Sequence, residues 1–239
     1  MEIPDMQHQV MGYDRSATMF SPDGHILQVE YAEKTVRLGA ASIGINCEDG
    51  VIIVADKGKK DSLIVHNSFD KVNEIDDHIM ASAAGIISDA RVLVNHIRVS
   101  AQQHRVTYAS PIDTESIIRE ISDIQQQYTQ HPGVRPFGVA LIVAGITGEK
   151  SRLYTSDITG NYFEYSAVAI GDNDEKIKDI LRKEFKQSIN TDAGIKLALK
   201  IFKEIKGEKY NIENFDIAII KNDDKKFKRL RKEDLKKYG

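Results

Sequence analysis

Hydrophobic positions recur along the chain with two different periods, which separate predicted helices from predicted strands. Apolar residues spaced three or four apart predict helices over 23–38, from about 88, from 113, over 172–186 and over 191–206. Short apolar runs without that spacing predict strands over 41–47, 51–56, 78–84, 138–145, 153–156, 162–170 and 215–220. Strands and helix pairs therefore follow one another in blocks. This order favours an α+β fold of stacked sheets covered by helices over alternating parallel units.

The first helix is predicted to begin near Asp23, because Ser21 can cap free N–H groups and Pro22 tolerates a first turn. Gly39 is a candidate left-handed stop. Two adjacent apolar rows run along this helix: Ile26, Val29, Ala32 and Val36, and beside them Leu27, Tyr31 and Leu38. Such a broad stripe fits either a well-buried helix in a monomer or a helix partly covered by another chain.

Composition indicates one large domain. The chain has 239 residues, is 41% hydrophobic and contains no Gly, Pro or Ser-rich linker. We expect a flexible tail over 1–12, the helix over 23–38, a sandwich over 40–220 and a charged segment over 221–239. A net charge of −3 gives no general reason to bind nucleic acid or an anionic membrane, so a protein partner or a second copy is favoured.

Cysteine content and the missing hydrophobic signals predict the cellular location. Cys47 is the single cysteine, which excludes an internal disulfide framework and suits a reducing compartment. No apolar run is long enough for a signal peptide core or a membrane span. We expect a cytoplasmic protein without membrane attachment.

Histidine spacing argues against a metal site. His96 and His104 lie two turns apart on one predicted helix, too far to share an ion, and His66, His78 and His131 have no partner motif. No glycine loop of the phosphate-binding kind occurs, so we expect neither a metal nor another cofactor. The lysines and arginines after Lys221 lack aromatic residues for base stacking, which favours a solvated strand edge and a final helix.

Three short sequence motifs near the N-terminus, each without gaps, resemble those of a known family. Tyr13 to Arg15 reads Tyr-Asp-Arg, Phe20 to Gly24 reads Phe-Ser-Pro-Asp-Gly, and Gln28 to Ala32 reads Gln-Val-Glu-Tyr-Ala. Together with segments 76–78, 85–93 and 127–138, they resemble proteasome alpha subunits of the archaeal type. The resemblance implies a four-layer αββα sandwich of the N-terminal nucleophile hydrolase type.

The resemblance also implies a role and partners. Alpha subunits form the outer ring of the 20S core, here expected to be a homoheptamer, and assemble with separate catalytic beta subunits. The ring gates the entry of unfolded proteins in ubiquitin-independent or general degradation and docks an ATPase regulator through the regulator's C-terminal tails. Tail 1–12 would form the gate, and four residues match the gating cluster: Tyr13, Asp14, Pro22 and Tyr31. Each of the four could equally stabilise a local turn.

The family's docking pocket maps onto three residues of this chain. Lys71 matches the lysine that pairs with the regulator's terminal carboxylate, and Gly39 with Gly85 would allow a close backbone approach. Without the resemblance, Lys71 would be interpreted as an ordinary surface lysine.

The sibling beta subunits suggest the remaining alternative. They use an N-terminal threonine as nucleophile, and alignment through Gly44 places Ala40 at that position. Asp56 and Lys71 match the supporting acid and lysine. The chain is therefore predicted to be non-catalytic. The alternative is a self-processing amidohydrolase of the same fold, for which Ser42 and Cys47 are the nearest other nucleophiles, each inside a predicted strand.

Overall fold

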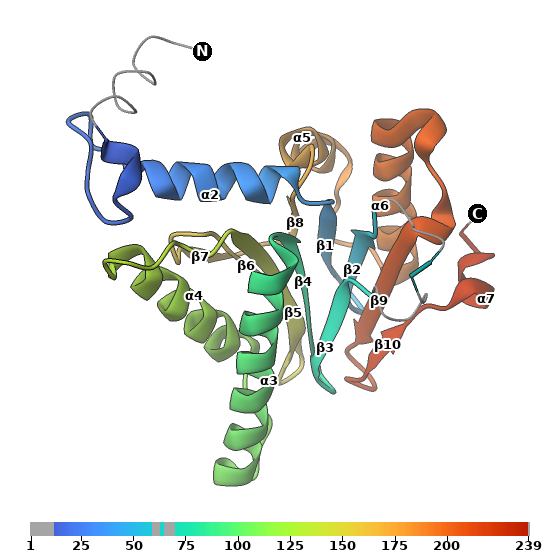
Figure 1. The fold of residues 1–239 in the computed structure, drawn as a ribbon. Helices are drawn as coiled ribbons and strands as arrows, with labels where there is room; N and C mark the ends of the chain where they lie inside the picture. The colour runs from blue at the N-terminus through green and yellow to red at the C-terminus, as the bar shows by residue number, and fades with distance from the viewer. Residues whose placement is uncertain (1–11, 59–62, 65–69, 239) are drawn as a thin grey trace.

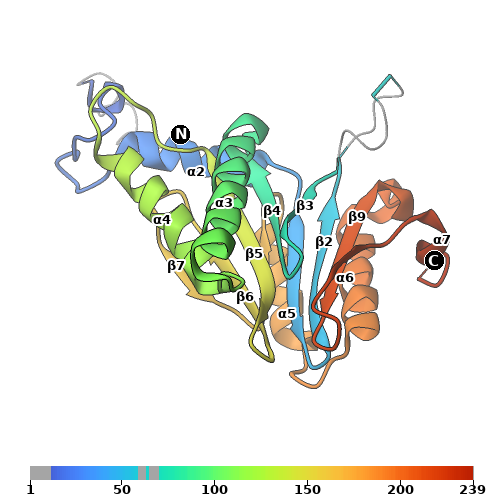
Figure 2. The same ribbon diagram turned by 90° about the horizontal axis from the view of Figure 1, so that it is seen from below.

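The computed structural model describes residues 12–58, 63–64 and 70–238, which form two stacked five-stranded sheets between two helix layers (Figures 1 and 2). The first sheet has the order β10 (Phe227–Arg229), β9 (Phe215–Lys221), β2 (Gly50–Asp56), β1 (Ser42–Cys47) and β8 (Ala167–Ile170). The second has the order β3 (Val72–Asp76), β4 (Ile79–Gly85), β5 (Val139–Thr147), β6 (Lys150–Ser156) and β7 (Tyr162–Glu164). Every strand pair is antiparallel.

Helices α3 (Ile87–Tyr108) and α4 (Thr114–Gln130) cover the outer face of the second sheet, and α5 (Asp174–Glu184) and α6 (Thr191–Lys206) cover that of the first (Figure 2). Helix α2 (Leu27–Leu38) lies across one end of the sheets (Figure 1). The short elements are η1 (Tyr13–Arg15), η3 (Gly207–Lys209), η4 (Ile212–Asn214) and α7 (Lys232–Leu235). The predicted αββα sandwich is confirmed.

Three apolar layers hold the sandwich together, one between the sheets and one beneath each helix pair. Alternate residues of β2 serve two of these layers, because Ile52 packs toward α6 while Val51 and Ile53 pack against the other sheet. Both faces of the central strands are therefore buried. This burial explains why these strands read as continuous apolar runs rather than as alternating ones.

The residues before α2 form a turn rather than the expected helix cap. Gly24 adopts φ +82°, and the Ser21 N–H donates to the His25 carbonyl at 2.7 Å, so the chain doubles back and α2 begins only at Leu27. Gly39 is extended at φ −72°, so the predicted left-handed stop is wrong. Of the second apolar row, Leu27 is buried but Leu38 is 85% exposed.

Two strand predictions need correction. Segment 162–170 is not one strand, because β7 pairs with β6 in the second sheet whereas β8 pairs with β1 in the first. The chain crosses between the sheets at Tyr165 and Ser166. Strand β3 was not predicted, because the polar residues Asn73 and Glu74 break its apolar pattern, and as an edge strand it needs only one covered face.

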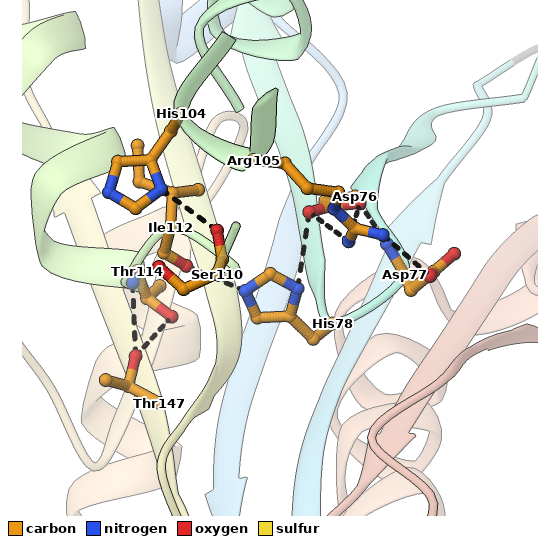
Figure 3. Close-up of polar contacts among 9 residues, drawn as sticks. All are labelled: Asp76, Asp77, His78, His104, Arg105, Ser110, Ile112, Thr114 and Thr147. Carbon is orange, nitrogen blue, oxygen red and sulfur yellow. Dashed lines mark hydrogen bonds and ion pairs between the residues drawn. The ribbon is translucent and has the colours of Figure 1, made fainter. Parts of the chain in front are cut away.

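The connection between α3 and α4 is anchored by polar contacts to strand ends (Figure 3). His78 is buried, and its Nε2 lies 2.7 Å from the Ile112 carbonyl oxygen. Arg105 binds both carboxylate oxygens of Asp76 at 2.7 Å. Asp113 caps α4 by accepting from the Ser116 N–H at 2.8 Å. His78 thus has a structural role in fixing this loop.

Neither a metal centre nor a membrane span occurs in the part of the chain that the structure describes. No three His, Cys, Asp or Glu side chains converge there in a geometry that could hold an ion. His66 lies outside the described residues. No described helix combines the length and the apolar character required to cross a bilayer.

Candidate functional site

A pocket of about 370 Å³ opens at the C-terminal end of α2 and contains all three residues predicted for docking, Lys71, Gly39 and Gly85. The ends of α2, β2 and β4, the start of α3 and the segment before β3 form its walls. The other lining residues are Leu38, Ala40, Asp56, Lys57, Asp70, Asn73, Ala83, Ala84, Ile87, Ala90 and Val139. Topology therefore collects residues that are far apart in the sequence at one end of the sandwich.

The two glycines let the chain pack backbone on backbone at this end. A Cβ atom on Gly39 would lie 2.3 Å from the Gly85 nitrogen. Gly85 adopts φ +119°, and a Cβ there would lie 2.1 Å from the Gly138 carbonyl oxygen. The segment after α2 can therefore contact the end of β4 only because both positions lack a side chain. The close approach that these glycines permit in the structure is to their own chain.

Hydrogen bonds anchor both the backbone and the side chain of Lys71, and its amine is largely shielded from water. Its N–H donates to Asp216 Oδ2 at 2.7 Å, and its Nζ donates to the Ala40 carbonyl oxygen. Burial lowers the pKa of Lys71 to about 8. The nearby Asp56 and Asp216 carboxylates oppose this shift, whereas the positive charge of Lys206 adds to it.

The acids around Lys71 already have cationic partners. Asp56 forms an ion pair with Lys206 and accepts from the Gly58 N–H at 2.9 Å. Arg229 lies 2.8 Å from Asp70 and 3.0 Å from Asp216. Lys57 also pairs with Asp70, at 2.9 Å.

The Lys71 ammonium differs from these paired groups. Among the residues that the structure describes, no carboxylate lies within ion-pair distance of its ammonium, whose polar contact is a neutral carbonyl. Lys206 and Arg229 were not predicted as neighbours of this site. No local pattern marks them, because the packing of α6 on the first sheet brings Lys206 to the site and the strand order brings Arg229 there.

Comparison with known proteins shows the family to which the chain belongs. Residues 36–220 match the model of the proteasome subunit family, and residues 13–34 match the N-terminal signature of its A-type members. The chain belongs to the proteasome subunit family. Over 227 residues it is 44% identical to a proteasome alpha subunit of Pyrococcus horikoshii, a match that covers 95% of this chain and 86% of the relative.

Other archaeal relatives are also similar to this chain along nearly its whole length. A proteasome alpha subunit of Archaeoglobus fulgidus is 41% identical over 95% of this chain and 92% of its own length. The proteasome alpha subunit 2 of Haloarcula marismortui is 41% identical over 95% of this chain and 93% of its own. The resemblance inferred from the sequence, a proteasome alpha subunit like those of archaea, is thereby confirmed.

The residues that match the gating cluster lie toward the other end of α2 from the pocket (Figure 1). Tyr13 and Asp14 are on η1, although the Asp14 side chain lies outside the described part. Pro22 is exposed on the turn that precedes α2. Tyr31 is half-buried on α2, with the Lys34 ammonium 5.2 Å from its ring centre. Their joint role in a gate stays a prediction, as does that of tail 1–12, of which only Gly12 is described.

The position that matches the catalytic threonine of the sibling subunits lies in the same pocket. Ala40 lines it together with Asp56 and Lys71 and has no nucleophilic atom. Ser42 is fully buried, with its hydroxyl 2.8 Å from that of Ser82. Burial, together with the charge of Asp49, raises the pKa of Cys47 to about 12. Neither side chain is an activated nucleophile.

Proposed function

We propose that this chain is a non-catalytic alpha subunit of the 20S proteasome core, that seven copies form the outer ring, and that the pocket around Lys71 docks an ATPase regulator. The catalytic beta subunits would be separate chains, and the substrates unfolded proteins in the cytoplasm. The observation that carries the proposal is the Lys71 ammonium, which faces a pocket and has no carboxylate partner among the described residues.

A C-terminal carboxylate of the regulator would complement the charge of the Lys71 ammonium in this pocket. In a partly enclosed pocket an ammonium and a carboxylate form a charge-assisted hydrogen bond, which is stronger than the contact of Lys71 with a neutral carbonyl. Leu38 is 85% exposed and Ile87 is 71% exposed at the pocket rim, where they offer apolar contacts to the residues that precede the terminus. Such terminal capture is a recurring mode of peptide recognition.

Docking would then control entry rather than chemistry. The pocket lies at the C-terminal end of α2. The residues that match the gating cluster lie toward its N-terminal end: Tyr13 on η1, Pro22 in the turn before α2, and Tyr31 on α2 itself. Because α2 joins the two regions, a regulator that prefers one position of this helix would shift the gate from closed to open, in proportion to its differential affinity. This shift between the closed and open gate would require no catalytic residue in this chain.

The absence of a nucleophile at position 40 supports the non-catalytic assignment. Asp56 and Lys71 can support peptide-bond hydrolysis only if a hydroxyl or thiol nucleophile lies beside them, and Ala40 offers none. The alternative, a self-processing hydrolase, would require Ser42 or Cys47 to leave a buried strand.

The test is Lys71→Ala in particles assembled from this chain, the beta subunits and the ATPase regulator. Removal of the ammonium should reduce regulator-stimulated peptide hydrolysis to the basal rate and leave the basal rate unchanged, since docking and chemistry reside in different chains. Lys196→Ala, which removes an exposed lysine of α6, is the matched control and should keep full stimulation. Retained stimulation in the Lys71 variant would refute docking, and loss of basal hydrolysis would favour the hydrolase.

A further inference from the structure

The features that make Lys71 a docking cation also make its amine chemically reactive. We propose that Lys71 is an acylation site, modified at Nζ by small acyl thioesters. The proposal deepens the regulation of the docking pocket and rests on the proposed function for its consequence, although not for its chemistry.

The pocket provides the space and the surface that a short acyl group needs. Its volume is about 370 Å³, and its lining includes the apolar side chains of Leu38, Ala83 and Ile87. The strongly exposed Leu38 and Ile87 show that its rim is open to solvent. The pocket therefore has room for an acetyl or propionyl group on Nζ and offers it apolar contacts.

Ion pairs hold the neighbouring lysines in place, but none is found for the Lys71 amine among the described residues. The Lys57 and Lys206 ammonium groups are held in ion pairs with Asp70 and Asp56, so each would have to abandon a carboxylate before it could react. Lys71 has only the Ala40 carbonyl as a polar partner of its Nζ among the described residues. Burial has already lowered its pKa to about 8. Around pH 8 a substantial fraction of this amine is therefore uncharged and nucleophilic.

Acylation of Nζ by a thioester requires neither an oxidant nor a reductant. The neutral Nζ attacks the carbonyl carbon of the thioester and forms a C–N bond, and the C–S bond then breaks. The departing thiolate takes up the proton that the nitrogen releases, so the products are an amide and a free thiol. The amide keeps one N–H, which can still donate to the Ala40 carbonyl, but the positive charge is gone.

Loss of that charge would uncouple the ring from its regulator. A regulator's carboxylate would meet a neutral amide instead of an ammonium and would lose the charge-assisted bond. Acylation at Lys71 would thus link docking to the supply of acyl donors in the cell.

The experiment treats the native, assembled protein with acetyl coenzyme A and follows each lysine by quantitative peptide mass spectrometry. At pH 7.5 Lys71 should be acetylated more than about tenfold faster than Lys196, because an ordinary lysine with a pKa near 10.4 is almost wholly protonated there. The rate at Lys71 should also level off above about pH 8, whereas rates at exposed lysines keep rising. Equal rates at the two lysines, with one shared pH profile, would overturn the proposal.

Two variants separate chemistry from simple accessibility. Asp56→Asn removes a charge that stabilises the Lys71 ammonium and should speed acetylation. Lys206→Gln removes a repelling charge and frees Asp56, so it should slow acetylation. If both variants fold and neither moves the rate, the amine is not the controlling group and the proposal fails.

Docking is tested separately, by regulator stimulation in the Lys71→Ala particle. Rapid acetylation of Lys71 without any docking defect in that particle would leave the acylation site standing and refute the proposed function. A docking defect together with slow acetylation would support the proposed function and refute the acylation site.

Discussion

Single buried charges at the ends of the sheets are fixed by partners from distant segments. Asp216 shows this best, because its carboxylate accepts from the backbone N–H groups of Lys71 and Val72 at 2.7 and 2.8 Å while it also binds Arg229. Removal of one such partner leaves a buried acid unsatisfied, which costs more than the bond itself contributes. The position of Lys71 therefore depends on β9 and β10 as much as on its own segment.

Asp89 near the start of α3 gives the clearest dependence on pH. The hydrogen bond from Arg135 lowers the pKa of Asp89, burial opposes this shift, and the Gly138 N–H, which donates at 2.9 Å, lowers the pKa further. Because the folded-state pKa lies below the unfolded value of about 3.9, the stabilisation is complete above that value and is lost as pH falls through the folded-state pKa.

Asp89→Asn should therefore lower the free energy of unfolding by about 1 kcal/mol at pH 6, a typical value for a charge-assisted bond that is partly exposed. The difference from the parent chain should shrink as pH falls below about 4. Urea unfolding at several pH values measures it, with Asp123→Asn on the exposed side of α4 as the control. A difference that stayed constant down to pH 3 would exclude this ion pair as its origin.

Backbone contacts between the ends of several elements help to shape the pocket. The segment after α2 reaches the end of β4 through Gly39 and Gly85, and β4 in turn lies against Gly138 before β5. The Ile86 N–H donates to the Gly138 carbonyl at 2.9 Å, which ties the start of α3 to the same place. Four elements thus meet within backbone contact.

Gly39→Ala tests this packing. The added methyl would lie 2.3 Å from the Gly85 nitrogen, a backbone atom that cannot turn aside, so α2 must shift from β4. We expect a loss of about 1–3 kcal/mol in the free energy of unfolding, as for overpacked cores, together with weaker regulator stimulation. Leu38→Ala, at an 85% exposed neighbour, should change stability by less than about 0.5 kcal/mol. Unchanged stability in the Gly39 variant would contradict the close contact.

At the scale of elements, most helices and strands could be predicted because the layers impose clear periods. Asp113 marks the start of α4 by capping it, and the buried run of β5 reflects cover on both faces. The start of α2 could not be predicted, because Ser21 uses its hydroxyl to close a turn onto His25 rather than to cap a helix. The split between β7 and β8 could not be predicted either, since an apolar run does not show which sheet each half joins.

The candidate site could be predicted only in part, for a related reason. Lys71, Gly39 and Gly85 came from family resemblance, and the structure brings all three into one pocket. The physical reason for the glycines, contact within their own chain, was not visible in the sequence. Nor were the ion pairs that occupy Asp56 and Asp70, because antiparallel pairing across the sheet sets which distant segments meet.

The whole molecule is a sandwich whose two sheet ends differ in character. One end carries α2, the pocket and the close glycine contacts, and the other carries the turn at His78 and the connection between α3 and α4 (Figures 1 and 3). The proposed ring subunit would use this asymmetry, because one end would receive the regulator and the opposite end would face away from it.

The most direct test of the account is the native mass of the purified chain expressed alone, followed by its denatured mass. Seven copies of the 26.8 kDa chain predict a ring of about 190 kDa, or about twice that if rings stack, in which every chain remains intact. Loss of about forty residues from the N-terminus, which would leave a chain that begins near Ala40, would contradict the account. That result would show self-cleavage and identify the protein as a hydrolase.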